Sequence, residues 1–139
     1  MAKQIITDIK NLKQNSVRAG FFESRRIIKD LEKTLATTRN GIGLSAIQIG
    51  IYRKVSIIRL PNFKLNLINA EIIYKADPFR MKGEACLSLP GLSIDTKRYN
   101  LIKLKNGKIY KGLIAVAIQH ELDHQKGILI LDRKWRKRK

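Results

Sequence analysis

The stretch Gln119-His120-Glu121-Leu122-Asp123-His124 contains both histidines of this 139-residue chain. On an α-helix the two imidazoles lie one turn apart and within about 40° of each other, so both can reach one metal ion. Glu121 points to the side of that pair, where a carboxylate can hydrogen-bond a metal-bound water without being a ligand. The spacing therefore predicts two ligands of a hydrolytic metal site and its general base. The alternative is a histidine pair that only packs or lies exposed.

The helix that carries this stretch can be delimited from its ends. Gly112 opens it, and Gly127 lies just past its last polar turn. Helical spacing places one set of residues on a single face: Leu113, Val116, Ala117, His120, Glu121 and His124. A second apolar stripe beside it consists of Ile114, Ile118 and Leu122. Because the helix is apolar nearly all round up to residue 118, we expect it in the core, with the histidines at the floor of a cleft.

Composition limits the class of protein. Lys and Arg total 29 against 11 acidic residues, a net charge of +18, which favours an anionic partner such as nucleic acid, a ribosome or an anionic membrane. The longest apolar run, 113–118, is far shorter than the ~20 residues that span a bilayer, and residues 1–10 lack the apolar segment of a signal peptide. The length fits one domain over 1–139, and we expect it in the cytosol.

The first half of the chain predicts one amphipathic helix. Residues 1–20 are polar, and we expect them to be irregular or partly helical. Ser24 is the predicted N-cap of a helix that ends by Asn40-Gly41. Its apolar face consists of Ile27, Ile28, Leu31 and Leu35.

Strands are expected between the two helices. Residues 52–60 and 65–74 are rich in Ile, Val and Tyr and predict strands separated by Pro61-Asn62, whereas 75–83 is expected to be loop. Residues 101–105 and 108–110 flank Asn106-Gly107, a sequence typical of a β-hairpin. One helix, several antiparallel strands and a final buried helix predict an α+β fold.

A third metal ligand must come from outside the histidine stretch. After His124 only Asp132 remains as a candidate. Upstream lies Cys86, the only cysteine, which excludes an intrachain disulfide. A thiolate and two imidazoles suit Zn²⁺ or Fe²⁺, with a fourth position open to water. A lone cysteine is more often a buried, inert residue, and for Cys86 the residues alone leave both interpretations open.

Three segments, taken together and in order, resemble the motifs of peptide deformylase. They are Gly41-Ile42-Gly43-Leu44-Ser45-Ala46-Ile47-Gln48, Glu84-Ala85-Cys86-Leu87-Ser88 and the histidine stretch 119–124. This resemblance implies a metal-dependent hydrolase that removes the N-formyl group from the N-terminal formyl-methionine of new polypeptides and releases formate. Two positions depart from the family pattern, because Ala85 replaces a usual Gly and Ser45 a usual Ala.

The resemblance also assigns roles to individual residues. Cys86, His120 and His124 would hold one divalent metal ion, with Fe²⁺ as the native ion and Zn²⁺ as the other candidate. Glu121 would be the acid and base. The Gln48 side-chain amide and the Leu87 backbone N–H would stabilise the oxyanion.

By the same resemblance, the substrate methionine would enter an apolar pocket. Its predicted lining is Ile42, Leu113, Val116 and Ala117, with Glu84 at its edge. The Gly43 and Ala85 backbones would hydrogen-bond the peptide, as in strand addition.

The resemblance also bears on partners and cellular context. The expected partners are nascent formyl-methionyl chains and a ribosome, the latter through the basic surface and the tail 133–139. We expect a monomer that does not enter membranes. The chain stops 15 residues after His124, and in this it resembles short bacteriophage deformylases without a C-terminal helix extension. The expected location is therefore the cytoplasm of a bacterium or of a phage-infected host.

Two other functions fit parts of the sequence. Another small metallopeptidase would use the same metal and base but would cleave internal amide bonds. A basic nucleic-acid-binding or ribosome-binding protein with a structural Cys-His-His metal would need a fourth protein ligand. Net charge is the main support for this last alternative.

Overall fold

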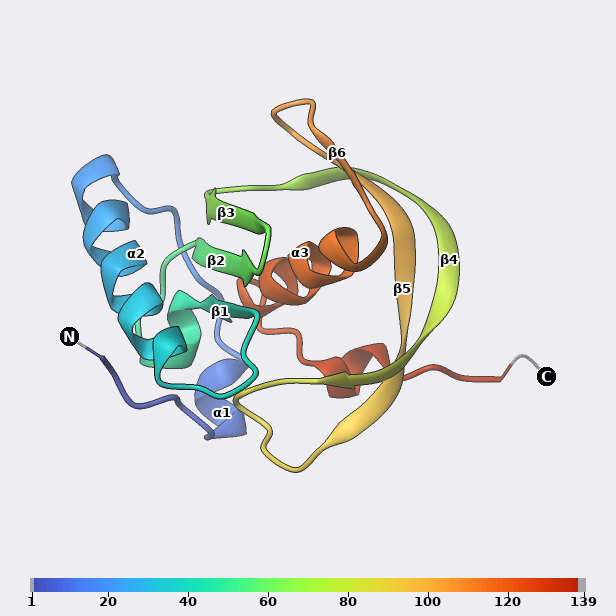
Figure 1. Ribbon diagram of the computed structural model, residues 1–139, viewed down its shortest axis with the longest axis horizontal. Helices are drawn as coiled ribbons and strands as arrows, with labels where there is room; N and C mark the ends of the chain where they lie inside the picture. Colours follow the sequence, from blue (N-terminus) through green and yellow to red (C-terminus); the bar gives the residue numbers. More distant parts are fainter. Residues whose placement is uncertain (1, 138–139) are drawn as a thin grey trace.

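The computed structural model describes residues 2–137 and contains two antiparallel sheets with a helix between them (Figure 1). The strand orders are β1-β2-β3 and β4-β5-β6. The strands are β1 (Gly43–Ser45), β2 (Val55–Leu60), β3 (Phe63–Ile68), β4 (Ile72–Ala85), β5 (Ser93–Leu104) and β6 (Ile109–Lys111). The helices are α1 (Ile9–Leu12), α2 (Phe21–Ala36), α3 (Gly112–His124) and the 3₁₀ turns η1 (Ala46–Ile49) and η2 (Ile130–Arg133). This arrangement confirms the predicted α+β class.

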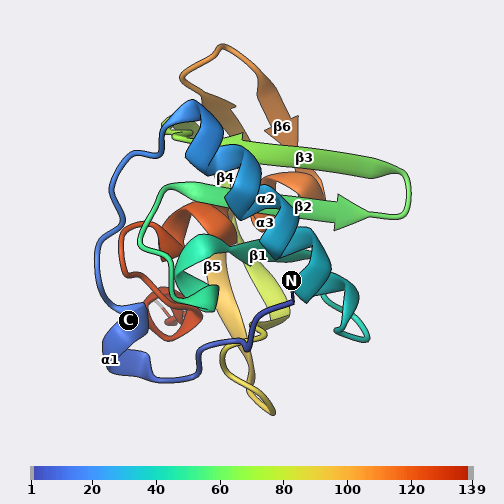
Figure 2. The same ribbon diagram turned by 90° about the vertical axis from the view of Figure 1, so that its left-hand side faces the viewer.

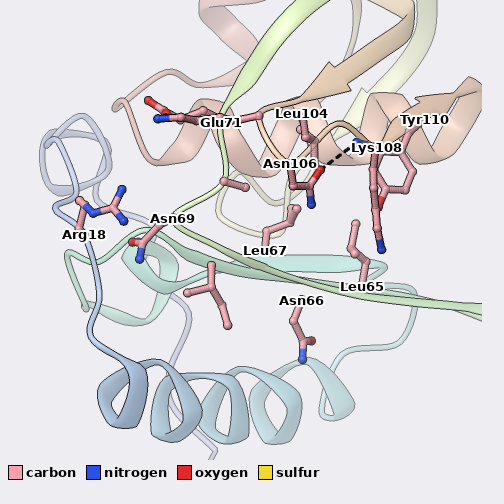
Figure 3. A pocket seen from close by; sticks show the side chains of 13 residues that line it. Arg18, Leu65, Asn66, Leu67, Asn69, Glu71, Leu104, Asn106, Lys108 and Tyr110 are labelled. Atoms are coloured by element: carbon pink, nitrogen blue, oxygen red, sulfur yellow. Dashed lines mark hydrogen bonds and ion pairs between the residues drawn. The ribbon is translucent and has the colours of Figure 1, made fainter.

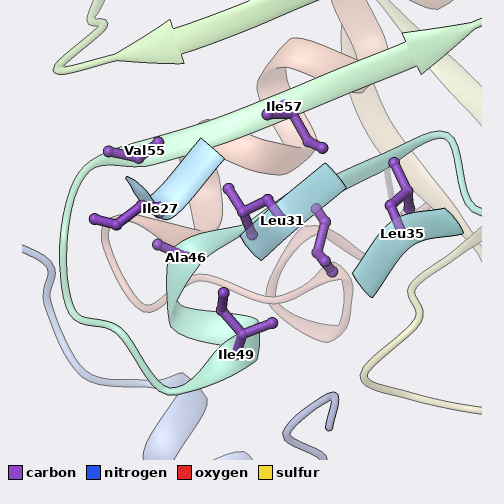
Figure 4. Close-up of a cluster of buried hydrophobic side chains, with 8 residues drawn as sticks. Ile27, Leu31, Leu35, Ala46, Ile49, Val55 and Ile57 are labelled. Carbon is purple, nitrogen blue, oxygen red and sulfur yellow. The ribbon is translucent and has the colours of Figure 1, made fainter. Parts of the chain in front are cut away.

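Helix α2 covers the outer face of the first sheet (Figure 2). Its predicted apolar face is confirmed, because Ile27, Leu31 and Leu35 pack against Val55 and Ile57 of β2 (Figure 4). The opposite face of the helix carries its basic residues, which are exposed. Spacing at i, i+4 and i+8 is thus sufficient to orient this helix on the sheet.

Strand β2 is buried on both faces, which explains its nearly continuous apolar sequence. Val55 and Ile57 face α2, whereas Ile58 joins the cluster around α3. Successive side chains of a strand point to opposite sides of the sheet, so a strand between two helices can bury both faces. In β2 the residues from Val55 to Ile58 are buried, and Arg59 and Leu60 are half-buried. Ser56 points to the α3 side, and its hydroxyl reaches the functional site described below.

The predicted start of α2 is wrong. The helix begins at Phe21 with Gly20 as N-cap, and Glu23 Oε1 accepts a hydrogen bond from the Gly20 N–H at 3.2 Å. Ser24 lies inside the first turn, where its hydroxyl donates to the Phe21 carbonyl at 2.8 Å. A carboxylate three residues after the N-cap can satisfy the end of a helix without a Ser or Thr cap. The helix ends at Ala36, four residues before the predicted boundary.

Two strand predictions are also wrong. The predicted strand 65–74 is divided between β3 and β4 by Asn69, whose φ is 52° and whose side chain bonds to the Ala19 backbone. The predicted loop 75–83 belongs to β4, which pairs with β5 along most of its length. Asp77 and Pro78 are tolerated there because β4 is an edge strand.

The hairpin at Asn106-Gly107 and the helix starting at Gly112 are confirmed. Helix α3 packs against the first sheet and β5 through Ala115, Ile118 and Leu122. Its burial is incomplete, however, because the Leu113 side chain is 68% exposed at the first turn. Within residues 2–137, no helix is long and apolar enough to cross a bilayer.

Gly127→Ala is expected to lower the free energy of unfolding by about 2–4 kcal/mol. Gly127 has φ +70°, and an added Cβ would collide with the Lys13 backbone. Gly107→Ala is the matched control, because Gly107 has φ +89° with no atom near its would-be Cβ. Urea denaturation of both variants measures the difference. Equal losses would mean that the contact with Lys13 contributes nothing.

Candidate metal centre

Cys86, His120 and His124 come together where α3 ends and β4 has just finished. Their metal-binding atoms all lie within 4.8 Å of one another. Cys86 Sγ lies 3.5 Å from His124 Nε2, and the two imidazole centroids are 5.0 Å apart. The cysteine that the residues alone left ambiguous therefore lies beside both histidines. Among the described residues, this cluster contains no fourth Cys, His, Asp or Glu.

The surroundings of the two histidines suit metal binding. His120 Nδ1 lies 2.7 Å from Glu84 Oε2, which leaves Nε2 for an ion. His124 is buried, and its Nδ1 has no hydrogen-bond partner in the part of the chain that the structure describes. Burial and the adjacent His120 hold the pKa of His124 well below its usual value, so this imidazole is neutral, as a ligand must be. One thiol and two imidazoles form a donor set for Zn²⁺ or Fe²⁺.

Negative groups surround His120. Burial alone would lower its pKa, but Glu121, Cys86 and Glu84 raise it well above the usual value. An environment that favours a proton on this ring also favours a cation beside it. The groups around His120 therefore favour a bound cation, as the donor set of the cluster also does.

Glu84 is part of a buried ionic network. Its carboxylate accepts hydrogen bonds from Thr96 Oγ1 at 2.6 Å, from Arg98 Nε at 2.8 Å and from Arg98 Nη2 at 2.6 Å. Burial would raise the pKa of Glu84, but the bonds from His120 and Arg98 keep it well below its usual value. Arg98 also donates to Asp123 at 2.7 Å. Glu84 thus lines the cleft, and its carboxylate is turned toward His120 and orients that ring.

Thr96 and Arg98 were not found from the sequence. Both are buried on the same face of β5. The sequence predicts a strand from residue 101 and at most a short one at Ile94, so the strand that carries Thr96 and Arg98 is not predicted as one element. Thr96 and Arg98 share the period-two phase of Ile102 and Leu104 in the same strand, and this alternation is the signal that could have revealed them.

Glu121 lies beside the metal-binding cluster, with its side chain buried. Ser45 Oγ lies 2.9 Å from Glu121 Oε1 and 2.7 Å from Ser56 Oγ, so two hydroxyls follow one another toward the carboxylate. Burial raises the pKa of Glu121, and His120 and Ser45 partly oppose that shift. A raised pKa suits a group that accepts and returns a proton near neutral pH.

Gly43→Ala is expected to lower the turnover number of the metal-dependent hydrolysis predicted from the sequence by about 10²-fold, while the metal is retained. An added Cβ would stand 2.6 Å from Glu121 Oε2 and 3.1 Å from the Ile57 carbonyl, so the carboxylate must move. Steady-state kinetics and metal content measure this. Gly20→Ala adds its methyl to open space and is the control. An unchanged turnover number for Gly43→Ala would show that the position of Glu121 is not critical.

The Gln48 side chain faces the same cluster. Its Oε1 accepts a hydrogen bond from the Ser45 N–H at 2.9 Å, which fixes the orientation of the amide. The Nε2 group therefore points to Ser88 Oγ at 3.0 Å and to Cys86 Sγ at 3.6 Å. Among the described residues, the Leu87 N–H has no hydrogen-bond acceptor. Two donors thus lie around the cysteine.

A cleft of about 360 Å³ opens in front of these groups. All seven predicted substrate residues line it, namely Ile42, Gly43, Glu84, Ala85, Leu113, Val116 and Ala117. Gln48, Cys86, Leu87, His120 and Glu121 line it as well. Met81 also contributes to the wall, and it was missed because its segment was expected to be loop.

A larger hollow of about 490 Å³ lies between β3 and the β5–β6 hairpin (Figure 3). Asn66, Asn69 and Asn106 line it together with leucines and Tyr110. None of the predicted site residues borders this hollow. Chemistry rather than size therefore identifies the smaller cleft as the candidate site.

Comparison with known proteins agrees with this geometry. The family model for polypeptide deformylase matches residues 3–139. The peptide deformylase of Brachyspira hyodysenteriae is 38% identical over 123 residues, which cover 77% of this chain and 65% of that relative.

Solved structures give the same result. The peptide deformylase of Thermotoga maritima superposes with a TM-score of 0.87 at 26% identity, covering 98% of this chain and 99% of that one. The Synechococcus elongatus peptide deformylase in complex with actinonin has a TM-score of 0.83 at 31% identity, covering 98% and 80%. On the match to residues 3–139, the chain belongs to the polypeptide deformylase family.

Proposed function

We propose that this chain removes the N-formyl group from the formyl-methionine of new polypeptides and releases formate. The observation that carries the proposal is the cluster of Cys86, His120 and His124 with Glu121 and Gln48 around one cleft. Members of this family are metal-dependent enzymes. The residues over 1–139 would act as one catalytic domain.

Cys86, His120 and His124 would hold the metal ion. Fe²⁺ is the proposed native ion, and Zn²⁺ would fit the same donors. When bound, a divalent ion lowers the pKa of a coordinated water from about 15.7 to about 7 and polarises a carbonyl oxygen. The Glu84–His120 hydrogen bond would keep the ring of this ligand in place.

Glu121 would move the proton. It would accept the proton of the water that attacks the formyl carbon and donate it to the departing amine. The Ser45 hydroxyl at 2.9 Å would hold the carboxylate in position for both steps. Ser45 thus gains a role that the usual Ala of the family could not perform.

Gln48 and Leu87 would stabilise the oxygen that becomes negative as the formyl carbon turns tetrahedral. The Gln48 Nε2 group is already oriented by the bond from Ser45 N–H to Oε1. Loss of one such donor typically lowers the rate by ~10²–10³-fold.

The peptide would lie between the two sheets. Both β1, which contains Gly43, and β4, which ends at Ala85, are edge strands with backbone groups available for pairing. The methionine side chain would contact the apolar wall of Ile42, Leu113, Val116 and Ala117. The 68% exposure of Leu113 is consistent with a surface that a substrate covers.

This function places the protein where nascent chains emerge. We propose a monomer in the cytoplasm of a bacterium or phage-infected host, close to ribosomes. The net charge of +18 supports association with an anionic particle.

The test is formate release from formyl-Met-Ala-Ser by protein prepared anaerobically with Fe²⁺. Release that stops when a chelator removes the metal and returns when Fe²⁺ is restored would support the proposal. Acetyl-Met-Ala-Ser is the control substrate and should not be processed. Cleavage of internal peptide bonds without formate release would instead identify a metallopeptidase.

A further inference from the structure

Two adjacent phenylalanines lie on the surface at the start of α2. Phe21 and Phe22 are 70% and 77% exposed, more than any other large hydrophobic residue within residues 2–137. Their rings contact each other edge to face, with centroids 5.2 Å apart. Large apolar side chains that lie together in water mark a surface that a partner covers.

The helical spacing of α2 turns Phe22 away from the protein. Ile27 and Leu31 are buried against the first sheet. At 100° per residue, Phe22 lies on the side of the helix opposite Leu31. Lys29 and Lys33 lie within about 20° of Phe22 on that side. The ring therefore shares the solvent side of α2 with cations (Figure 2).

Arg25 and Arg26 complete this surface, which we call the α2 outer face. Its residues, all exposed, are Phe21, Phe22, Arg25, Arg26, Lys29 and Lys33. In the part of the chain that the structure describes, no salt bridge joins its four cations to a carboxylate. The α2 outer face thus combines apolar rings with positive charge.

The acidic residues of α2 offset little of that charge. Glu23 pairs with Arg53 at 3.1 Å, and Glu32 pairs with Arg59 at 3.0 Å. The third acidic residue, Asp30, is half-buried. The four cations of the α2 outer face therefore outweigh the negative charge of the helix.

An anionic lipid bilayer offers both kinds of contact that this face needs. Its headgroups attract cations, and the boundary between headgroups and acyl chains accepts apolar side chains. RNA fits less well, because stacking of bases needs an open ring face. The Arg25 guanidinium lies 5.8 Å from the centre of the Phe21 ring, which also contacts Phe22.

The rings lie at the end of α2 that is far from the cleft. A helix rises 1.5 Å per residue, so Phe21 and Ala36 are ~22 Å apart. The residues that line the cleft begin at Asn40, beyond the C-terminal end of α2. Contact through Phe21 and Phe22 would thus leave the cleft accessible.

We infer that the α2 outer face binds the surface of an anionic phospholipid bilayer. Phe21 and Phe22 lie at the boundary between headgroups and acyl chains, and the four cations contact lipid phosphates. The inference does not depend on deformylase activity, because none of the predicted site residues belongs to this face.

The experiment is sedimentation of the metal-loaded protein with large vesicles of equimolar phosphatidylglycerol and phosphatidylcholine. Affinity should be at least about tenfold higher than for phosphatidylcholine alone, since each cation near an anionic surface adds about fivefold. Phe21→Ala, Phe22→Ala should bind the anionic vesicles at least about tenfold more weakly, because two rings no longer leave water.

The matched control is Ile73→Ala, Ile109→Ala. These side chains are 57% and 56% exposed in the second sheet, away from α2 (Figure 1). This variant should bind the vesicles within about twofold of the parent. Equal weakening of both variants, or no weakening of either, would overturn the inference. Formate release from free peptide should stay within about twofold in both.

Phe22→Trp gives a second readout that does not depend on the double variant being folded. Its fluorescence should move to shorter wavelength with anionic vesicles, relative to the parent, whose one tryptophan is Trp135. No such shift would contradict contact of the ring with lipid. The inference also fails if Phe21→Ala, Phe22→Ala loses affinity for single-stranded RNA while its affinity for vesicles is unchanged.

Discussion

Glu121→Gln is expected to slow formate release by about 10²–10⁴-fold while the metal stays bound. The substitution keeps the size of the side chain and an oxygen that can accept from Ser45, which lies 2.9 Å from Oε1. It removes the ability to accept a proton. The buried carboxylate has a raised pKa, as a residue that both accepts and donates a proton requires.

Single-turnover kinetics with formyl-Met-Ala-Ser measure the rate of formate release. Metal analysis of the same samples measures the metal content. Ser45→Ala is the companion variant, because it removes only the hydroxyl and should retain much more activity than Glu121→Gln. If Glu121→Gln with full metal content released formate at the parent rate, another group would have to be the base. Loss of metal together with activity would instead place Glu121 in the metal site.

Arg98→Leu is expected to lower the free energy of unfolding by about 3–5 kcal/mol. The guanidinium is 2% exposed and pairs with Glu84, which is 6% exposed, and with Asp123. Removing it would leave a buried carboxylate without its cation. Glu84 would also hold the His120 ring less firmly, so weaker metal retention is expected.

Urea denaturation at neutral pH measures this loss, and metal analysis after dialysis measures retention. Arg80→Leu is the control, because the Arg80–Asp95 pair is exposed and should contribute far less. Equal destabilisation by both variants would contradict a special role for the buried network. The pKa of folded Glu84 lies below its usual range, so this contribution is complete above the unfolded pKa of about 4.3. It is lost as the pH falls through the lower, folded value.

The local pattern of the sequence was sufficient for elements whose signals lie within a few residues. The spacing of His120 and His124 and the apolar positions of 113–118 predicted α3, and Asn106-Gly107 predicted the hairpin before it. These signals are local because a helix or a tight turn is closed by hydrogen bonds between near neighbours. The three motifs likewise indicated which residues line the cleft, and all seven predicted substrate residues do so.

Other features depended on residues far apart in the chain. Residues 75–83 carry no clear strand pattern, and only pairing with β5 makes them part of β4. A register shift between Met81 and Glu84, with Gly83 at φ +63°, interrupts that pairing, which resumes at Glu84 and Ile94, where the Glu84 side chain is buried. The partners of Glu84 come from β5 and α3, so its role in orienting His120 could not be read from its own segment.

The sequence by itself thus determined the spacing of the two histidines, the glutamate beside them and the helix that carries all three. The residue pattern alone left Cys86 open and only the family resemblance assigned it to this site, and the tertiary structure brings it beside the two histidines. The tertiary structure alone decided that Ser45 contacts Glu121 and that Arg98 neutralises Glu84. The physical reason is that a helix sets the spacing of residues four apart, whereas contacts between distant segments depend on how the two sheets pack around α3.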